Sequence, residues 1–465
     1  MPAIITDTFK KQLTQTIFDE SRLDSARYYI GIGKSEPYDS AETVTTPTDT
    51  PRTIRNVRAG LQSIKSASDV SYVIPRYNWS SGAFYNAYDD DFASIPATNS
   101  YYVLTEDNQV YICLQQSKTA AGVVNASTVK PTGTGTKPIK TADGYVWKYL
   151  FSLSATRSSK FLSSNFVPVE KILDSSDLGR PLAGFELLQD QVQNAAVPGQ
   201  ILGIKVTNAG TGYTSTPSVT IDGDGVRASA TASFSGGVVS KIEMDSSTDS
   251  TMAMGQGFNF ASVSISAPDS AGGIQATARA IIGPDAGLGA DVRDELKATS
   301  LMFNTKPNGI EDSNFIVGQD FRQVTLIRNP LHSSDSAADG PPFTTSSGKV
   351  LNFLKLQATA NAGFLDATIT GGTSGAKAFV DEVENDKLYF HQSEETGFKP
   401  FQEGEAITGG GQSGTLVAAG VDADSDAFTR DDVEKLSGEI VYIENRAPVT
   451  RAANQTEDIK VVITL

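Results

Sequence analysis

The sequence predicts a mainly β protein, with minor α+β content, that is divided into several domains. Its 41 glycines and many Ser and Thr residues favour short strands joined by turns over bundles of helices. At 465 residues the chain is long for one domain, so two to four units are expected. The 22 Phe and 15 Tyr residues are sufficient to build their cores. We expect a β-sandwich-type core interrupted by two small all-β inserts.

A helix is expected near the start of the chain, followed by a buried strand. Phe9, Leu13 and Ile17 recur every four residues, which is the spacing of one helix face. Asp7 is available as the N-terminal cap. The continuous apolar run Tyr28-Tyr-Ile-Gly-Ile-Gly33 predicts a strand that is buried on both faces.

A β-hairpin and a half-buried strand are expected next. Strand-like runs at Tyr101–Leu104 and Val110–Leu114 flank the polar turn Thr105–Gln109. Further along, Tyr145–Leu153 alternates aromatic and polar residues. This alternation predicts a strand with one face in the core and one face in solvent.

Residues 186–289 are rich in Ala, Gly, Ser, Thr and Val and contain an internal repeat. The segment Gly210-Thr-Gly-Tyr213 recurs about 45 residues later as Gly255-Gln-Gly-Phe258. Such a period is typical of one supersecondary unit per repeat. The glycines permit a tight turn, and the aromatic residue is expected to close the end of each unit. We predict a small all-β insert.

A second repeat indicates a second insert at 342–428. Ala367-Thr-Ile-Thr-Gly-Gly-Thr-Ser-Gly375 recurs about 38 residues later as Ala406-Ile-Thr-Gly-Gly-Gly-Gln-Ser-Gly414. Short strands with Gly-rich turns at this density predict a small barrel or sandwich. Pro341-Pro342 and the acidic run Asp422–Asp432 provide its boundaries.

The last part of the chain predicts two strands joined by a polar arm. Ile440–Ile443 and Ile459–Leu465 are strand-like, and a run of β-branched residues at the chain end is expected to be tied into a sheet. The arm between them carries Arg446, Arg451, amides and carboxylates. It is too polar for a core, so we expect an extended surface segment with partners on another element or another chain.

Charge and cysteine content exclude several classes of protein. The net charge of −16 argues against a nucleic-acid groove, because phosphate contacts need clustered Lys and Arg. The single cysteine, Cys113, lies in an apolar strand pattern, which favours a buried inert thiol and a reducing cytoplasm. No run approaches the about 18 apolar residues of a membrane span, and no signal-peptide core is present. We therefore expect assembly inside a cell.

Motifs for nucleotide or metal chemistry fail on their context, and no cofactor is expected. Gly31-Ile-Gly-Lys-Ser35 ends like a phosphate-binding loop, but Tyr28 stands where that loop needs a glycine. Glu36-Pro37 also disfavours the helix that must follow, so a strand and a turn are predicted instead. His332 and His391 have no metal-binding spacing with another His or Cys, and neither is near a nucleophile elbow.

Carboxylate chemistry remains open, because 54 acidic residues could supply a glycosidase pair. The densest cluster is Asp89-Asp-Asp91. Asp222-Gly-Asp224 superficially resembles a calcium loop but lacks its later ligands and its closing Glu. A solvated turn is the favoured interpretation of both, and calcium at Asp222 and Asp224 is a minor hypothesis.

Tryptophan and arginine residues are the candidates for subunit contacts. Both types dominate interface hot spots, and Arg pairs with carboxylates on other elements or subunits. Two alternatives stay open, namely core packing for the tryptophans and exposed salt bridges of little value for the arginines. The candidate interface residues are Arg76, Trp79, Trp147, Arg322, Arg328, Arg446 and Arg451.

Five segments carry a resemblance to a known family. They are Ile30–Pro37, Val73–Trp79, Asp143–Phe151, Asp320–Pro330 and Ser437–Leu465. Together, and in this order, they resemble the gene-8-type baseplate wedge subunit of T-even-like contractile-tailed bacteriophages. The matching pieces cover roughly half of the chain, at 1 to about 180, about 291 to 331 and about 433 to 465. Five motifs in one order are more specific than any one of them alone.

The resemblance implies a wedge core made of residues 1–185, 290–341 and 429–465, with inserts at 186–289 and 342–428. It implies a non-enzymatic structural protein of the virion, located in the tail baseplate and assembled in the host cytoplasm. It further implies a homodimer that contacts other baseplate wedge proteins and peripheral fibre-carrying proteins, without binding nucleic acid or inserting into a membrane. Such a subunit transmits the change of baseplate shape that triggers sheath contraction.

Two other function classes stay open. The repeat-bearing inserts are compatible with a receptor-binding or carbohydrate-binding virion tail protein. A carboxylate-based glycan or peptidoglycan hydrolase is the third alternative, since the acidic residues are numerous.

Overall fold

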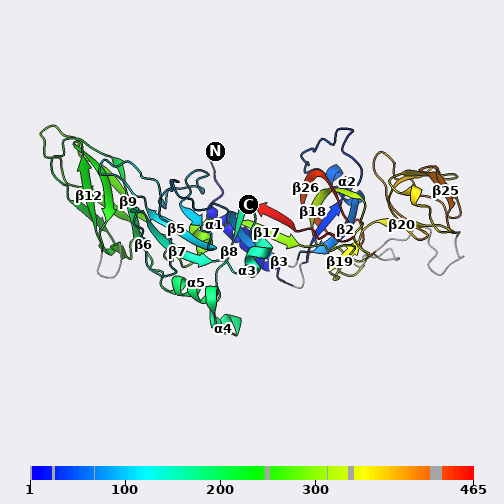
Figure 1. Cartoon of the computed structure of the whole chain (residues 1–465), viewed down its shortest axis with the longest axis horizontal. Coiled ribbons are helices and arrows are strands. Elements are labelled where there is room, and N and C mark those ends of the chain that lie inside the picture. Colours follow the sequence, from blue (N-terminus) through cyan, green and yellow to red (C-terminus); the bar gives the residue numbers. More distant parts are fainter. Residues whose placement is uncertain are drawn as a thin grey trace. The chain divides into compact units, whose positions relative to one another are not determined.

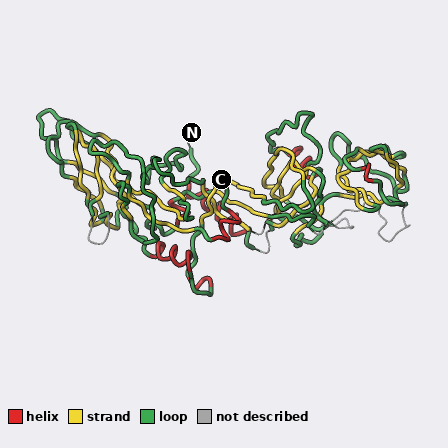
Figure 2. The backbone as a smooth tube through the Cα atoms, in the orientation of Figure 1, coloured by secondary structure: helices red, strands yellow, loops and turns green. Residues whose placement is uncertain are grey.

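The computed structural model describes residues 3–23, 27–67, 69–246, 252–311, 313–333, 340–418 and 432–465. The fold is mainly β, with 38% strand and 12% helix, and its sheets are antiparallel (Figures 1 and 2). None of the described helices combines the length and apolar character needed to cross a membrane. The mainly β fold class predicted from the sequence is confirmed.

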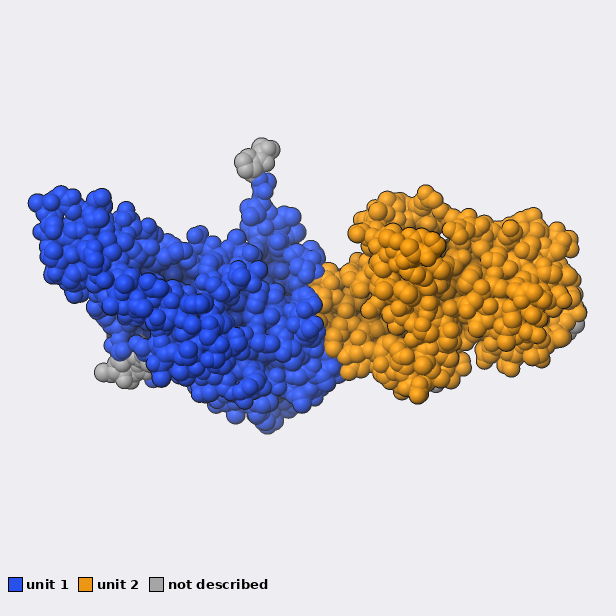
Figure 3. All heavy atoms as spheres, turned by 45° about the horizontal axis from the view of Figure 1, so that its top comes forward, with its two compact units in different colours: residues 1–14, 71–300, 464–465 blue, residues 15–70, 301–463 orange. Residues whose placement is uncertain are grey.

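The chain divides into two compact units, each assembled from separate segments (Figure 3). Unit 1 comprises residues 1–14, 71–300 and 464–465, and unit 2 comprises residues 15–70 and 301–463. The first repeat region therefore belongs to unit 1 and the second to unit 2. Residues 1–185, expected as one segment, are shared between the two units. The predicted boundary at 428–429 and most of the acidic run Asp422–Asp432 lie outside the described residues.

The N-terminal helix α1 (Asp7–Glu20) confirms the predicted helix, although its apolar face is only partly covered. Phe9 is 57% exposed and Leu13 is also exposed, whereas Thr14 is buried. The four-residue spacing thus predicted the helix correctly, and of its apolar face Ile17 is half-buried.

One sheet in unit 1 contains the predicted hairpin. Its strands, in order across the sheet, are β4 (Tyr102–Leu104), β5 (Gln109–Gln115), β7 (Val146–Ser152) and β6 (Ile139–Lys140). β4 pairs with β5 as expected. Every residue of β7 is buried, so the half-buried prediction was wrong. The reason is that both faces are covered: helix α5 (Gly184–Asn194) packs against Trp147, and Lys148 on the opposite face reaches the carbonyl of Leu288.

The other described elements of this part of the chain are short. They are β3 (Asp69–Pro75), α3 (Ala155–Phe161), β8 (Phe166–Val169), α4 (Ser175–Leu178) and α6 (Val292–Glu295). β3 and β8 pair in antiparallel fashion.

The first repeat region forms small antiparallel sheets with the strand orders β10-β15-β16-β9, β11-β14 and β12-β13. The strands are β9 (Ile201–Asn208), β10 (Val219–Gly223), β11 (Val226–Ala228), β12 (Ala230–Ser235), β13 (Val238–Met244), β14 (Met254–Gln256), β15 (Ala261–Ile265) and β16 (Thr277–Ile282). β10 and β15 are the equivalent strands of the two repeats, and they pair with each other.

The repeated Gly-x-Gly-aromatic segments behave as the sequence predicted. Gly210 and Gly255 have φ angles of 64° and 63°, in the left-handed region that favours glycine. The aromatic residues that follow, Tyr213 and Phe258, are 2% and 4% exposed. Each glycine pair makes the turn, and each aromatic ring fills the space beneath it.

In unit 2, one sheet brings together segments that are far apart in the sequence. Its strands, in order, are β19 (Ser347–Lys349), β2 (Leu61–Ser66), β1 (Tyr28–Gly33), β18 (Asp320–Arg328) and β26 (Glu439–Thr450). β1 has the predicted bounds and is buried throughout. In Figure 1 the red strand β26 lies beside β18, with which it pairs along its length.

β26 is longer than the strand predicted at Ile440–Ile443 and takes up the first part of the expected arm. That part of the arm therefore finds its partner in β18 of the same chain. The last strand, β27 (Ile459–Thr464), lies next to β17 (Ser300–Thr305) and agrees with the prediction. Helix α2 (Pro51–Ala59) lies between β1 and β2 in the sequence.

The second repeat region forms a closed six-stranded barrel. Its strands, in order, are β20 (Asn352–Lys355), β23 (Lys387–His391), β22 (Lys377–Glu384), β21 (Thr368–Gly371), β24 (Ala406–Gly409) and β25 (Gln412–Thr415), with the short helix η1 (Ala362–Phe364). A bridge between Leu356 and Leu416 joins the first strand to the last. Closure removes the free sheet edges, and the repeated strands β21 and β24 pair with each other.

Candidate functional site

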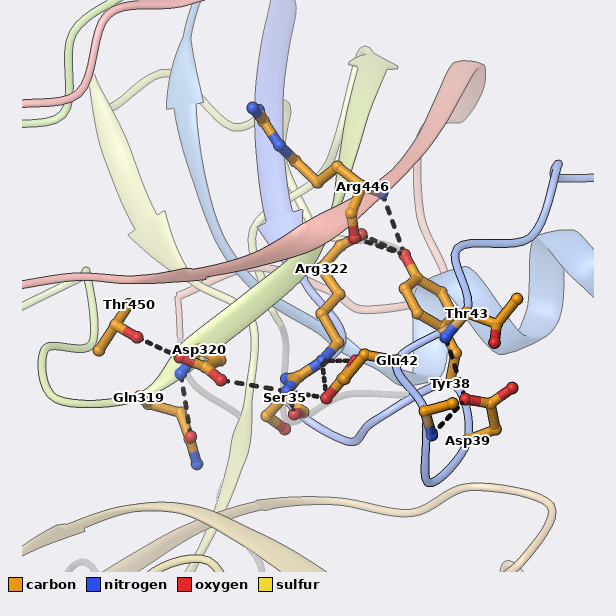
Figure 4. A network of polar contacts seen from close by, with 11 residues as sticks. Ser35, Tyr38, Asp39, Glu42, Thr43, Gln319, Asp320, Arg322, Arg446 and Thr450 are labelled. Carbon is orange, nitrogen blue, oxygen red and sulfur yellow. Dashed lines mark hydrogen bonds and ion pairs between the residues drawn. The ribbon is translucent and has the colours of Figure 1, made fainter.

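A network of polar contacts surrounds Arg322 on strand β18 (Figure 4). The Arg322 side chain is only 5% exposed. Its Nη2 lies 2.6 Å from Oε1 of Glu42 and 3.0 Å from Oδ2 of Asp320, and its Nε donates to Glu42 at 2.9 Å. Its Nη1 donates to the carbonyl of Ser35. A buried guanidinium is thus satisfied by two carboxylates and a main-chain oxygen.

The loop that follows β1 supplies most of these partners, and its own turn is well defined. Lys34 has a φ of 62°, which turns the chain out of the strand. Asp39 accepts hydrogen bonds from the backbone N–H groups of Ala41 at 2.8 Å and Thr43 at 3.0 Å. The N–H of Thr43 is the largest cause that lowers the pKa of Asp39, and the turn presents Glu42 to Arg322.

Tyr38 connects this loop to two neighbouring strands. Its hydroxyl donates to the carbonyl of Arg322 on β18 and accepts from the N–H of Arg446 on β26 at 3.1 Å. The ladder between β18 and β26 has a register shift here, because Phe321 lies opposite Val449 whereas Gln323 lies opposite Asn445. Tyr38 therefore bridges the two strands where their pairing is interrupted, and it holds the loop to the sheet.

The same loop also contacts the barrel, through a cluster that sequence reasoning missed. Asp381 on β22 accepts hydrogen bonds from the hydroxyl of Ser35 and from Nδ1 of His391, the latter at 2.6 Å. The second ring nitrogen of His391 lies 3.3 Å from Glu36. Ser35 and Asp381 are 346 residues apart, so no local spacing could have indicated the contact.

This cluster is electrostatically coupled but differs from a hydrolase triad. Burial alone would lower the pKa of His391, but the Asp381 and Glu36 carboxylates outweigh it and raise this pKa to about 9. At neutral pH the imidazole is therefore a cation. In a triad the histidine lies between the serine and the carboxylate, whereas here Asp381 lies between Ser35 and His391. The arrangement joins two elements and does not activate the serine.

Two cavities of unit 2 adjoin this cluster. One has a volume of about 340 Å³ and the other about 470 Å³, and both are lined by Asn56, Ala59, His391 and Glu394. Glu394 forms an ion pair with Arg52 of α2 in which both guanidinium and carboxylate are partly exposed. The cavities thus lie where α2 meets the loop that follows β23.

Two of the seven candidate interface residues are wholly buried inside the chain. Trp147 packs against Tyr85 and Tyr145, with ring centroids 5.4 and 5.7 Å apart. Arg451 donates to the carbonyl of Gly309 at 2.8 Å and pairs with Glu457 at 2.9 Å. Both side chains are enclosed by their own chain, and Trp147 occupies the core position that was the alternative to an interface role.

Three other candidates are partly exposed and are bound within the chain. Arg76 donates to the carbonyl of Ser163 at 2.8 Å. The indole of Trp79 donates to the hydroxyl of Ser127 at 3.2 Å. Arg328 on β18 pairs with Glu20 at 3.3 Å and Glu439 at 2.9 Å. These contacts tie neighbouring elements together within the described residues.

Arg446 differs from the other candidates. Its backbone contacts Tyr38, while its guanidinium points away from the network in Figure 4. No ion pair or side-chain hydrogen bond joins that guanidinium to another residue of the described part of the chain. Arg446 is half-buried and is therefore the candidate best placed to meet a partner.

Three of the carboxylate candidates, Asp89, Asp90 and Asp224, are engaged in structural contacts. Asp89 is buried and pairs with Lys205 at 2.7 Å and with Arg279, so the prediction of a solvated turn was wrong for this residue. Asp224 accepts from the N–H of Asn259 at 2.9 Å, while Asp222 is exposed. The described residues contain no cluster of three or more potential metal-ligating side chains.

Cys113 is buried as predicted, and burial raises the pKa of its thiol. A thiol held in the protonated form is a poor nucleophile.

Comparison with known proteins adds no relative. No protein-family model matches the chain, and no curated protein matches it.

Proposed function

We propose that this chain is a structural wedge subunit of the baseplate of a contractile phage tail. It would link neighbouring wedge proteins and the peripheral, fibre-carrying proteins, and it would transmit the change of shape that triggers sheath contraction. The proposal rests on the resemblance of five segments, including Ile30–Pro37, Asp320–Pro330 and Ser437–Leu465.

One observation carries the proposal. These three resembling segments contain the neighbouring strands β1, β18 and β26, with Ile30 opposite Leu326 and Leu326 opposite Tyr442. Thr325 of β18 is 294 residues from Gly31 of β1, and Arg328 of β18 is 111 residues from Glu439 of β26, with long segments that lack the resemblance between the strands. Segments that share a sheet form one structural core, which supports treating them as parts of a single family domain with insertions.

The loop after β1 supports the mechanical part of the proposal. Residues Ser35 to Glu42 are fixed to the sheet through Arg322 and to the barrel through Asp381. Buried, fully paired polar contacts resist sliding, because separation leaves charges without partners. Such a loop is suited to coupling two elements of a subunit that must transmit force.

The proposal can be tested on virions of the phage that encodes the chain. Antibodies raised against the purified protein should label the distal end of the tail in immunogold electron microscopy. A phage with a stop codon early in the gene should produce heads and tail components without complete baseplates. Label confined to the head, or normal tails from the stop-codon phage, would overturn the proposal.

A second candidate function is carbohydrate binding by unit 2, which the 470 Å³ cavity favours. Phe398 on its rim is 60% exposed, and Asn352 and Gln392 also line it. A sugar ring has an apolar C–H face and polar edges, so an aromatic ring flanked by amides matches it chemically. Glycan-array binding by the whole chain that is lost in Phe398→Ala would support this candidate, and an array without signal would remove it.

A further inference from the structure

A cavity in unit 1 has a charge that contrasts with the rest of the protein. It has a volume of about 370 Å³ and lies between the β6–β7 region and the first repeat region. Its described lining includes Lys137, Lys148 and Arg227 but no Asp or Glu, although the chain has a net charge of −16. A local excess of positive charge in an acidic protein attracts anions from solution.

The buried member of this group is Lys148. Its side chain is 3% exposed, and its ammonium donates to the carbonyl of Leu288 at 2.8 Å. An ammonium has three N–H donors, so this contact leaves donors for a ligand. Burial lowers the pKa of Lys148 to about 8, which leaves it mainly charged at neutral pH.

A buried carboxyl group, that of Glu295, interacts electrostatically with Lys148. Glu295 accepts from the N–H of Gly289 at 2.5 Å, and its second oxygen has no hydrogen-bond partner among the described residues. Burial raises the pKa of Glu295 to about 8, against the opposing effects of the Gly289 N–H and the Lys148 charge. The charge of Glu295 in turn opposes the lowering of the Lys148 pKa, so the two groups are coupled, while the contact to Leu288 still leaves N–H donors of the ammonium for a ligand.

The remaining lining gives the cavity a mixed character. Lys137 and Arg227 are exposed, and no described residue forms an ion pair with either of them. Arg227 has a φ of 68°, a backbone conformation that non-glycine residues rarely adopt. Met252 and Met254 also line the cavity with flexible apolar side chains, of which only 2% and 6% is exposed.

We propose that this cavity binds a small organic anion, with a carboxylate or phosphate group meeting Lys148 and Arg227 and an apolar part lying against Met252 and Met254. The charge, the buried ammonium and the volume together define the ligand class, since pockets of about 300–1,000 Å³ accept small molecules. The inference does not depend on the baseplate proposal.

Isothermal titration calorimetry of the whole chain at low ionic strength tests the site. The probes are inorganic phosphate, citrate, glucuronate and adenosine monophosphate, which separate phosphate from carboxylate recognition and a bare ion from one with an organic body. We expect saturable binding of at least one organic probe, tighter than that of inorganic phosphate. Absence of saturable binding for all four probes at millimolar concentration would overturn the proposal.

The variants replace two exposed residues, whose loss is not expected to disturb folding, and the buried lysine. Arg227→Ala and Lys137→Ala alter exposed side chains, and each should weaken binding on the order of tenfold. Lys148→Met should abolish binding, and circular dichroism would show whether that variant folds. Lys140→Ala, an exposed lysine on β6 outside the cavity, is the matched control for loss of one charge. Equal weakening in Lys140→Ala and Arg227→Ala would mean a general charge effect and would refute the site.

Discussion

Asp224 and Asp269 occupy equivalent positions in the two repeats of the first insert, and each caps the loop of the other repeat. Asp269 accepts from the N–H groups of Thr214 at 2.7 Å and Ser215 at 2.9 Å, directly after the Tyr213 turn. Asp224 accepts from Asn259 at 2.9 Å, directly after the Phe258 turn. The duplicated segments therefore stabilise each other reciprocally, and the resemblance of Asp222-Gly-Asp224 to a calcium loop has a structural explanation.

The hydrogen bonds that Asp269 accepts from the other repeat are expected to be sensitive to acid. The N–H groups of Thr214 and Ser215 lower the pKa of Asp269 to about 2 from an ordinary value of 3.8. Because the folded-state pKa is depressed, the contribution to stability is complete above about pH 4 and is lost as the pH falls through about 2. Asp269→Asn should remove this acid dependence from the thermal midpoint, whereas Asp222→Asn, exposed on β10, should leave it unchanged. Identical acid profiles for Asp269→Asn and the parent protein would contradict the assignment.

Replacement of Arg322 is expected to destabilise unit 2 markedly. Arg322→Met leaves Glu42, Asp320 and the Ser35 carbonyl without their donor. Loss of one partner of a buried ion pair costs about 3–5 kcal/mol, and we expect about 2–3 kcal/mol because both carboxylates remain roughly a third exposed. Urea unfolding followed by circular dichroism measures the change.

The matched control for Arg322→Met is Arg446→Met on the neighbouring strand. Its guanidinium is outside the network, so the change in the free energy of unfolding should stay within about 0.5 kcal/mol. Similar losses in both variants would show that the network around Arg322 contributes no more than an ordinary surface charge.

The elements that could be predicted from sequence are those determined by neighbouring residues. The continuous apolar run of β1 identified a buried strand. The polar turn Thr105–Gln109 identified the hairpin of β4 and β5. The positive φ angles of Gly210 and Gly255 could be expected because glycine has no Cβ atom and adopts this conformation readily. Helix α2 was missed although Thr50 caps it, Pro51 begins it, and Ile54 and Val57 lie on one face, because only two apolar residues mark that face.

The features that could not be predicted depend on which distant segments meet. The alternation in β7 indicated one exposed face, but alternation carries no information about the segment that covers that face. Ser35, Asp381 and His391 belong to unrelated local patterns and become one cluster only after the barrel packs near the loop that follows β1. The sequence identified Arg322 as a candidate interface residue. Its ion pair with Glu42, which is 280 residues away, could be seen only in the structure.

His391 should titrate well above the ordinary histidine range. Its folded-state pKa of about 9, against 6.5 when unperturbed, means that its contribution to stability is complete below about pH 6.5 and is lost as the pH rises through about 9. A shift of this size corresponds to about 3 kcal/mol. Because the chain has two histidines, an NMR titration of the labelled imidazoles can separate them with a His391→Gln variant. A His391 midpoint near 6.5 would refute the coupling to Asp381 and Glu36.

Dimer formation, if it uses the region of β26, should depend on Arg446 and not on Arg451. Joint replacement of both arginines would be ambiguous, because Arg451 is buried and paired with Glu457, so its loss would damage the fold itself. Arg446→Glu reverses a charge that is unpaired within the described residues and should leave the thermal midpoint nearly unchanged. Light scattering behind size exclusion should give twice 49.3 kDa for the parent protein and a lower mass for the variant at the same concentration. A parent dimer that Arg446→Glu leaves intact would move the interface away from this strand, and a monomeric parent would remove the dimer from the proposed function.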